Sequence, residues 1–197
     1  VELSEDVMVI ADDVKALAIA GIMGGLSSSV TDETTEIFLE SAFFAPLAIA
    51  GRARKFGLHT DASQRYERGV DFELPMLAMH RASQLIAELA GGEFGPITVV
   101  ENAAVLPKRE AIELNQAQVD QLLGYSVDSD FITDALTRLG CIVTVETEGQ
   151  WSVVPPSHRY DMAIYQDLIE EVARIHGYDN IQISLPVIDV KLAKHQD

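Results

Sequence analysis

The sequence predicts an α+β fold, with a mixed α/β portion followed by a small winged-helix-like module. In the first part, short apolar runs typical of strands alternate with segments of helical spacing. In the second part the order is strand, helix, helix, hairpin and helix, which matches a winged-helix-like module. The stretch 102–108 contains Pro107 and is typical of a linker. We therefore expect domains at 1–105 and 106–178, and a final linker at 179–197.

The composition is that of a globular protein. The chain has 197 residues, of which 48% are hydrophobic, enough to bury a core. The longest apolar run, 42–50, contains Pro46 and is too short to span a bilayer, so no membrane partner is expected. The single cysteine, Cys141, excludes an internal disulfide and a multi-cysteine zinc site, and it fits a cytoplasmic protein. The net charge of -17 argues against nonspecific nucleic-acid binding, and we expect no DNA partner.

The chain begins with short strands. Residues 7–10 and 16–20 are apolar and flank the turn residues Asp12 and Asp13, so a hairpin is expected. The segment that follows, Gly21-Ile22-Met23-Gly24-Gly25, lacks the Lys-Ser/Thr ending of a phosphate-binding P-loop. It forms either a tight turn that needs positive φ or a backbone wall that a ligand approaches closely.

Glu40 is a candidate pocket carboxylate. Residues 36–41 alternate in the pattern of a strand, with Ile37 and Leu39 on one side and Glu40 near the end. The apolar residues 42–44 follow directly, and an acid in such surroundings is a candidate for a functional role. A surface acid at the end of a strand explains the same pattern equally well.

Residues 51–71, GRARKFGLHTDASQRYERGVD, concentrate positive charge in an acidic chain. They hold five of its 14 basic residues, namely Arg52, Arg54, Lys55, Arg65 and Arg68. Backbone donors at a helix start, with cations around them, suit a ligand that carries phosphate or carboxylate. Composition alone favours a simpler hypothesis, in which these arginines meet Asp61, Glu67 and Asp71 on a solvated helix pair.

Two helices are predicted around this stretch. A helix over 46–56 has proline in its first turn and glycine just past its end. A capping box of Asp61 and Gln64 opens a second, shorter helix. His59 and Thr60 then lie in a tight connection between the two helices.

The remaining elements follow from the same patterns. An amphipathic helix is expected at 74–90 and a strand at 97–100. After the linker we expect a strand at 112–114, helices at 115–123 and 130–139, a hairpin of strands at 141–145 and 151–154, and a helix at 163–176. Asn115 and Ser129 are the expected caps of the first two of these helices.

The last helix carries a candidate metal site. Asp167, Glu170 and Glu171 are spaced i, i+3, i+4 and share one face, and Asp161 lies just upstream. Four carboxylates without histidine or thiol favour a hard ion, Mg²⁺ rather than zinc. The same acids are typical of a solvated first helix turn, where the helix dipole favours them, and spacing alone supports that simpler hypothesis.

Several segments resemble one family. GIMGG, FLESAFFAP and GRARKFGLHTDASQRYERGVD resemble the editing domain of bacterial phenylalanine–tRNA ligase beta subunits. PPSHRYDMAIYQDLIEEVARIHGYDNI resembles the domain that follows it in the same subunit. The likeness covers nearly the whole chain in the same order, and the chain opens at Val1 without an initiator methionine. The likeness implies that the chain is a fragment, which begins midway through the editing domain and stops before the catalytic-like module.

The resemblance implies roles for residues already noted. In the family's editing pocket, the acid that matches Glu40 reads the tyrosine hydroxyl. The residues that match Thr60 and Ala62 shape the pocket, and Gly24 matches part of its wall. Histidine is a residue type that can act as a general base, but the resemblance does not assign this role to His59. We therefore expect His59 to have a positional role in the pocket. The family's magnesium carboxylates match Asp161, Asp167, Glu170 and Glu171.

The function that the resemblance implies is editing within an aminoacyl-tRNA ligase. The domain hydrolyses mischarged Tyr-tRNA(Phe), and so supports phenylalanylation of tRNA(Phe) by the alpha subunit of a class II, ATP-dependent enzyme. The family forms a two-alpha, two-beta heterotetramer in which the alpha subunit binds ATP. We expect little hydrolysis from this chain alone, because the family's pocket also uses basic residues upstream of it. The alternative is a non-catalytic module that holds subunits together.

Overall fold

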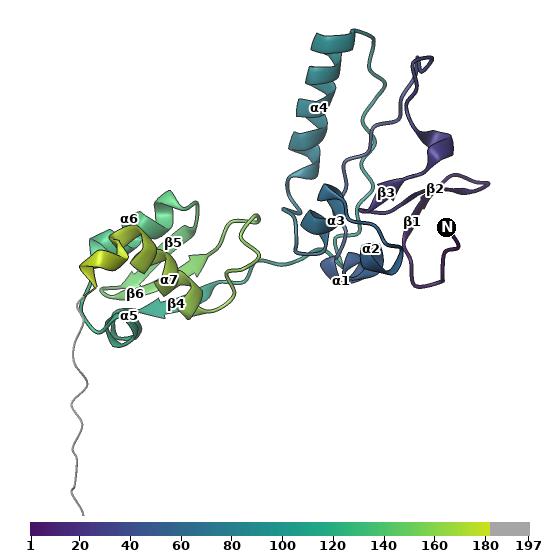
Figure 1. The fold of residues 1–197 in the computed structure, drawn as a ribbon. Coiled ribbons are helices and arrows are strands. Elements are labelled where there is room, and N and C mark those ends of the chain that lie inside the picture. Colours follow the sequence, from purple (N-terminus) through teal and green to yellow (C-terminus); the bar gives the residue numbers. More distant parts are fainter. Residues whose placement is uncertain (182–197) are drawn as a thin grey trace, which may run out of the picture. The chain divides into compact units, whose positions relative to one another are not determined.

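The computed structural model describes residues 1–181 and divides the chain into two compact units (Figure 1). Unit 1 is Val1–Arg109 with Ser157–Tyr160, and unit 2 is Glu110–Pro156 with the residues from Asp161 onward. The chain passes from the first unit to the second between Arg109 and Glu110. Most of the predicted final linker, residues 182–197, lies outside the described residues.

Unit 1 contains a small antiparallel sheet in the order β1-β2-β3. The strands are β1 Val9–Ala11, β2 Ala16–Ile19 and β3 Met23–Gly24. Asp12 fixes the β1–β2 turn, because its Oδ1 accepts hydrogen bonds from the backbone N–H groups of Val14 and Lys15 at 2.8 and 2.7 Å. The predicted hairpin is confirmed, and β3 extends it into the Gly-rich segment.

Two other predicted strands, at 36–41 and 97–100, are wrong, since both segments lack regular secondary structure. Their side-chain pattern fits a strand, but a strand also needs a neighbour that pairs with its backbone. β3 lies at an edge of the sheet and has only two residues, so it offers little backbone for pairing. Glu40 therefore lies on an irregular segment rather than near the end of a strand.

The helices of unit 1 are α1 Pro46–Ile49, α2 Arg52–Lys55, α3 Asp61–Tyr66 and α4 Pro75–Ala90, with a 3₁₀ turn, η1, at Leu26–Ser28. The single helix predicted over 46–56 is broken into α1 and α2. Gly51 has φ of +75°, a left-handed conformation that interrupts the helix at this point. Ile49 and Ala53, on either side of the break, still pack in one core cluster.

Unit 1 has a small core. Its buried cluster consists of Ile22, Ile49 and Ala53, against which Ile19, Phe44, Leu58 and Tyr66 pack. None of the 16 residues of α4 is buried. The core therefore joins the sheet, α1, α2 and α3, which are the parts of the chain where the sequence predicted a pocket.

Unit 2 is built from β4 Ile112–Asn115, α5 Gln116–Leu123, α6 Ser129–Arg138, β5 Ile142–Thr147, β6 Gln150–Val154, α7 Tyr165–His176 and a 3₁₀ turn, η2, at Tyr178–Asn180. Its antiparallel sheet has the order β4-β6-β5, with Trp151 opposite Leu114 and Val145. α6 packs against β5, and α7 packs against β4. The predicted element order is confirmed, as is the α+β fold class of the chain.

Side-chain caps set the starts of α5 and α6. Asn115 caps α5 as predicted, because its side chain accepts a hydrogen bond from Gln118 N at 3.0 Å and Gln118 Oε1 accepts one from Asn115 N at 2.9 Å. α6 is capped by Asp128 rather than by Ser129. Asp128 has a non-helical backbone with ψ of 133°, as an N-cap requires, whereas Ser129 is already in the helix.

Trp151 lies in the core of unit 2. It is 1% exposed, and its Nε1 donates a hydrogen bond to Thr133 Oγ1 of α6 at 2.9 Å. The buried cluster around it contains Leu114, Val119, Val127, Ile132, Leu136, Cys141, Val153, Met162, Leu168, Ile169 and Val172. Cys141 is thus a core residue just before β5. Apolar residues from the sheet and from all three helices meet in this cluster, so the core orients α7 and its acidic side chains.

Candidate functional site

Thr60 joins two of the segments that the sequence singled out. Its Oγ1 accepts a hydrogen bond from Ser63 N at 3.0 Å and caps α3, and the same hydroxyl donates one to the carbonyl of Ile22 at 2.8 Å. The capping box therefore consists of Thr60 and Ser63, and the box predicted one residue later is wrong. Thr60 has the extended backbone of an N-cap, whereas Asp61 is already helical. One side chain thus ties the start of α3 to the Gly-rich segment.

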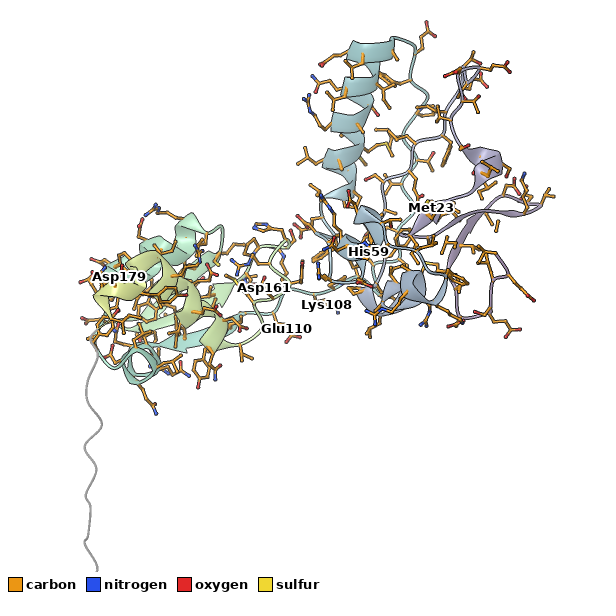
Figure 2. All side chains as sticks on the ribbon, viewed as in Figure 1. Met23, His59, Lys108, Glu110, Asp161 and Asp179 are labelled. Carbon is orange, nitrogen blue, oxygen red and sulfur yellow. The ribbon has the colours of Figure 1, made fainter. Side chains whose placement is uncertain are left out.

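The Gly-rich segment runs into β3, where Figure 2 labels Met23, and His59 is labelled just ahead of α3. At Gly24 an added Cβ would meet no atom within 4 Å. At Gly25 an added Cβ would lie 2.5 Å from the carbonyl oxygen of Leu17, so close packing explains that glycine. The open space at Gly24 is compatible with the predicted wall, because a ligand can approach the backbone there.

The segment that carries Glu40 is held against α3 by Tyr66. The Tyr66 hydroxyl donates a hydrogen bond to the carbonyl of Ala42 at 3.0 Å, and its ring centroid lies 5.1 Å from that of Phe44. Glu40 has exposed surface, yet neighbouring protein atoms partly desolvate its carboxyl and raise its pKa. The pKa of Tyr66 is also raised, first by burial and second by the negative charge of Glu40. Glu40 and Tyr66 therefore lie within electrostatic range of each other.

Ala62 and His59 lie on either side of Thr60 in the chain. Ala62 is half-buried in the first turn of α3, and His59 is exposed. Within residues 1–181, His59 has no hydrogen-bond or ion-pair partner. The Gly-rich segment and the Glu40 segment are thus both anchored to α3, the first by Thr60 and the second by Tyr66. The roles of these residues in a ligand pocket stay predictions.

The five basic residues of 51–71 fall into two groups. Arg52 and Lys55 pair with Asp6, each at 3.2 Å from its carboxylate. A hydrogen bond from Ser4 and the charge of Lys55 lower the pKa of Asp6 to about 2. The side chains of the other group, Arg54, Arg65 and Arg68, are exposed and have no hydrogen-bond or ion-pair partner among residues 1–181. The predicted pairing of these arginines with Asp61, Glu67 and Asp71 is therefore wrong.

The acidic residues of α7 have separate structural roles. Asp167 Oδ2 accepts hydrogen bonds from the backbone N–H groups of Ala163 and Ile164 at 2.8 and 2.9 Å, and so closes the first turn. Glu171 is 7% exposed and pairs with Arg174 three residues on. Glu170 is exposed, so the two neighbouring glutamates face different surroundings. These contacts account for two of the four carboxylates without a metal ion.

The predicted magnesium ligands do not form a metal site in this arrangement. Among residues 1–181, no three or more His, Cys, Asp or Glu side chains are grouped closely enough to hold an ion. Asp161, Asp167, Glu170 and Glu171 therefore do not fit Mg²⁺ as they stand. Magnesium binding stays a prediction, and no step of the chemistry below depends on it.

Two family models match the chain: a B3/4 domain over residues 1–91 and a tRNA synthetase B5 domain over residues 112–178. Over its whole length the chain is 80% identical to the phenylalanine–tRNA ligase beta subunit of Acinetobacter baylyi, and 53% identical to that of Aliivibrio fischeri. The chain belongs to the phenylalanine–tRNA ligase beta-subunit family. It spans about a quarter of the length of these relatives, 25% and 24% respectively.

The two matched domains of this beta-subunit chain correspond to the two units. Thr60, Tyr66 and Glu40 all fall within the B3/4 match, and α7 falls within the B5 match. Between residues 1 and 181, no helix combines the length and apolar character needed to cross a membrane.

Tyr66 and Asp6 are the structurally important residues that sequence reasoning missed. Tyr66 contacts a segment 24 positions earlier in the chain, and Asp6 binds side chains 46 and 49 positions later. No local pattern signals either contact. Ser63 is different, because its spacing of three from Thr60 is that of a capping box, although the motif usually has Glu or Gln at this position.

The beta-subunit chain is expected to lose stability as pH rises through the pKa of Glu40. Burial raises this pKa in the folded chain above the ordinary value of 4.5, so folding favours the protonated form. That contribution is fully present below the unfolded pKa and is lost as pH rises past the folded pKa. Urea unfolding from about pH 4 to pH 7 should show the Glu40→Gln variant gaining stability relative to wild type. A stability difference that does not change with pH would contradict the expected linkage.

Magnesium should stabilise this region only where a partner brings the four carboxylates together. We expect saturating Mg²⁺ to leave the melting temperature of this chain unchanged and to raise that of the assembled alpha–beta enzyme, by mass action on the folded state. Glu170→Gln removes one predicted ligand, an exposed carboxylate with no structural contact, and should therefore abolish the shift in melting temperature. If neither protein responds to Mg²⁺, the prediction of a magnesium site at these four residues is wrong.

Proposed function

We propose that this chain is part of an editing module that hydrolyses Tyr-tRNA(Phe) within phenylalanine–tRNA ligase. The observation that carries the proposal is the hydrogen bond from Thr60 Oγ1 to the Ile22 carbonyl, which joins the segments that would form the pocket. The alpha subunit would attach phenylalanine to tRNA(Phe) with ATP, in a cytoplasmic two-alpha, two-beta enzyme. The family assignment supports this larger setting.

The chemistry requires a pocket that recognises one hydroxyl group. Tyrosine differs from phenylalanine only by its phenolic hydroxyl group. A site that hydrogen-bonds this hydroxyl can favour tyrosine over phenylalanine by about 10⁴-fold or more. Glu40, when ionised, is a pure acceptor and suits a phenol donor. Its partial desolvation strengthens a charge-assisted hydrogen bond. In this proposal Glu40 recognises the tyrosine hydroxyl by accepting its hydrogen bond, and it is not the nucleophile.

The reaction is hydrolysis of an ester. Water attacks the carbonyl carbon of the tyrosyl ester, the bond to the ribose oxygen breaks, and tyrosine and uncharged tRNA leave. Gly24 presents an open backbone face, and Ala62, with a single methyl group, leaves room for the aromatic ring. His59 has its ring available for contact with the tRNA end, and the proposal gives it a positional role.

The test of this proposal is a deacylation assay on the two-subunit enzyme. Ala62→Trp should fill the pocket and abolish hydrolysis of both Tyr-tRNA and Phe-tRNA, while charging with phenylalanine is retained. Ala90→Trp is the matched control, because Ala90 is exposed at the last residue of α4. Full Tyr-tRNA hydrolysis by Ala62→Trp would contradict editing at this site and would favour a non-catalytic assembly module.

The tRNA partner is supported by the group of unpaired arginines. In a chain with net charge -17, Arg54, Arg65 and Arg68 keep their positive charges unneutralised within residues 1–181. Arg54 is on α2, Arg65 is in the last turn of α3, the helix that Thr60 caps, and Arg68 lies two residues past its end. Guanidinium groups bind phosphate through a planar fork of donors, so these three suit the backbone of an incoming tRNA.

Changing Arg54, Arg65 and Arg68 together to glutamine should raise KM for Tyr-tRNA deacylation and leave kcat near wild type. The slope of log affinity against log salt should become shallower by about 0.7 to 0.9 for each arginine that contacts phosphate. Arg52→Gln is the matched control, since that guanidinium already pairs with Asp6 at 3.2 Å. An unchanged salt slope in the triple variant would contradict an RNA-facing role.

A further inference from the structure

Tyr66 occupies the junction of three segments in unit 1. It is the last residue of α3, its hydroxyl donates to Ala42, and its ring packs with Phe44. The same two rings lie against Gly21, where an added Cβ would be 3.1 Å from Phe44 and 3.3 Å from Tyr66. One aromatic side chain thus contacts both the Gly-rich segment and the segment that carries Glu40.

The hydrogen bond to Ala42 matters because the Glu40 segment has few other anchors. Within the described chain, residues 36–44 belong to no helix or strand and make no backbone–backbone hydrogen bonds. Two side-chain bonds hold the residues just after Glu40: Ser41 Oγ donates to the Pro75 carbonyl at 2.8 Å, and Tyr66 Oη donates to the Ala42 carbonyl at 3.0 Å. These two hydroxyl groups, together with the ring contacts of Phe43 with Phe72 and of Phe44 with Tyr66, therefore hold the backbone beside Glu40.

Tyr66 is also kept in the state that this role requires. A phenol donates its proton only while it is neutral. An ordinary tyrosine is already neutral at pH 7, and burial and the charge of Glu40 raise the pKa of Tyr66 further.

We propose that Tyr66 is a positioning residue for tyrosine discrimination, because its hydroxyl fixes the backbone beside Glu40. This inference rests on the proposed function, in which Glu40 accepts a hydrogen bond from the substrate phenol. Tyr66 acts on the substrate through Glu40. A loosely held acceptor makes a weaker and less selective hydrogen bond, since geometry and donor–acceptor distance set its strength. Tyr66 thereby contributes to selectivity and not to the hydrolytic step itself.

The first test is Tyr66→Phe in the two-subunit enzyme. This change keeps the ring against Phe44 and Gly21 and removes only the hydroxyl. We expect kcat/KM for Tyr-tRNA deacylation to fall by about 5- to 10-fold, as for loss of one neutral hydrogen bond. Phe-tRNA deacylation and charging with phenylalanine should stay near wild type. Tyr178→Phe is the matched control, because Tyr178 is exposed and its hydroxyl makes no hydrogen bond within residues 1–181.

A double-mutant cycle with Glu40→Ala separates positioning from a general structural role. If Tyr66 acts through Glu40, the 5- to 10-fold effect disappears in the Glu40→Ala background. Additive effects, or an unchanged ratio of Tyr-tRNA to Phe-tRNA rates in Tyr66→Phe, would overturn the inference. If Glu40→Ala alone leaves that ratio unchanged, the assignment of Glu40 fails, which is a different result from failure of Tyr66.

Ser41→Ala provides a second route should Tyr66→Phe impair folding. It removes the other anchor of the same segment, the bond to the Pro75 carbonyl, without touching the aromatic core. The expected result is a loss of Tyr-tRNA selectivity in the same direction as for Tyr66→Phe, and equally dependent on Glu40. Full selectivity in Ser41→Ala would show that anchoring of this segment does not control discrimination, and would overturn the inference.

Discussion

Glu40→Ala in the two-subunit enzyme is expected to lower Tyr-tRNA hydrolysis by about 10- to 100-fold, toward the rate for Phe-tRNA. In the proposed function, the change removes a charge-assisted hydrogen bond to the substrate phenol, worth about 1.5–3 kcal/mol, or about one to two decades in rate. In the proposed function the alpha subunit charges tRNA with phenylalanine, so that charging should stay near wild type. Rates of deacylation of the two aminoacyl-tRNAs, measured side by side, report the effect.

Two controls identify the cause. Glu36→Ala removes an exposed acid from the same irregular segment and should leave both rates unchanged. Thermal unfolding should show Glu40→Ala to be folded, because the side chain has exposed surface and belongs to no core cluster. If Glu40→Ala keeps the wild-type ratio of the two rates, Glu40 does not read the hydroxyl.

Trp151→Ala should destabilise unit 2 by about 3–5 kcal/mol, the usual cost of deleting a large buried aromatic side chain. Trp151 is 1% exposed, pairs across the sheet with Leu114 and Val145, and hydrogen-bonds Thr133 on α6. Denaturant unfolding followed by far-UV circular dichroism measures the loss, since the chain has no second tryptophan to report by fluorescence.

Thr133→Val is the matched comparison for the two hydrogen bonds of the Thr133 hydroxyl, which accepts from Trp151 Nε1 and donates to the Ser129 carbonyl, each at 2.9 Å. It leaves the Trp151 ring in place but removes the acceptor of its Nε1–H and the bond to the Ser129 carbonyl, and should cost about 1–3 kcal/mol, mainly for the buried Nε1–H left unpaired. A loss below about 1 kcal/mol for Trp151→Ala would contradict its central place in the core.

Unit 2 was predicted well because its signals are local. The hairpin follows from two apolar runs around a turn, and the start of α5 follows from Asn115 and Gln118 at the spacing of a capping box. The cap of α6 was misplaced by one residue, because Asp128 and Ser129 are both good caps and only backbone geometry decides between them.

Unit 1 was harder because its structure depends on contacts between distant residues. A left-handed Gly51 breaks one expected helix, and the expected strand at 36–41 has no partner strand to pair with. The candidate site shows the same limit. Glu40 and Thr60 were named from the sequence, but the bonds that position them, from Tyr66 to Ala42 and from Thr60 to Ile22, join segments 24 and 38 residues apart.

We propose that the Gly-rich segment, the Glu40 segment and the start of α3 form one pocket for tyrosine. The most direct test is a crystal structure of the two-subunit enzyme with a non-hydrolysable tyrosyl-adenosine, in which an amide replaces the ester. The account predicts the phenol oxygen within about 2.5–2.8 Å of a Glu40 carboxylate oxygen, with the ring beside Ala62 and the open face of Gly24. A ligand bound elsewhere, or bound here with its phenol turned away from Glu40, would contradict it.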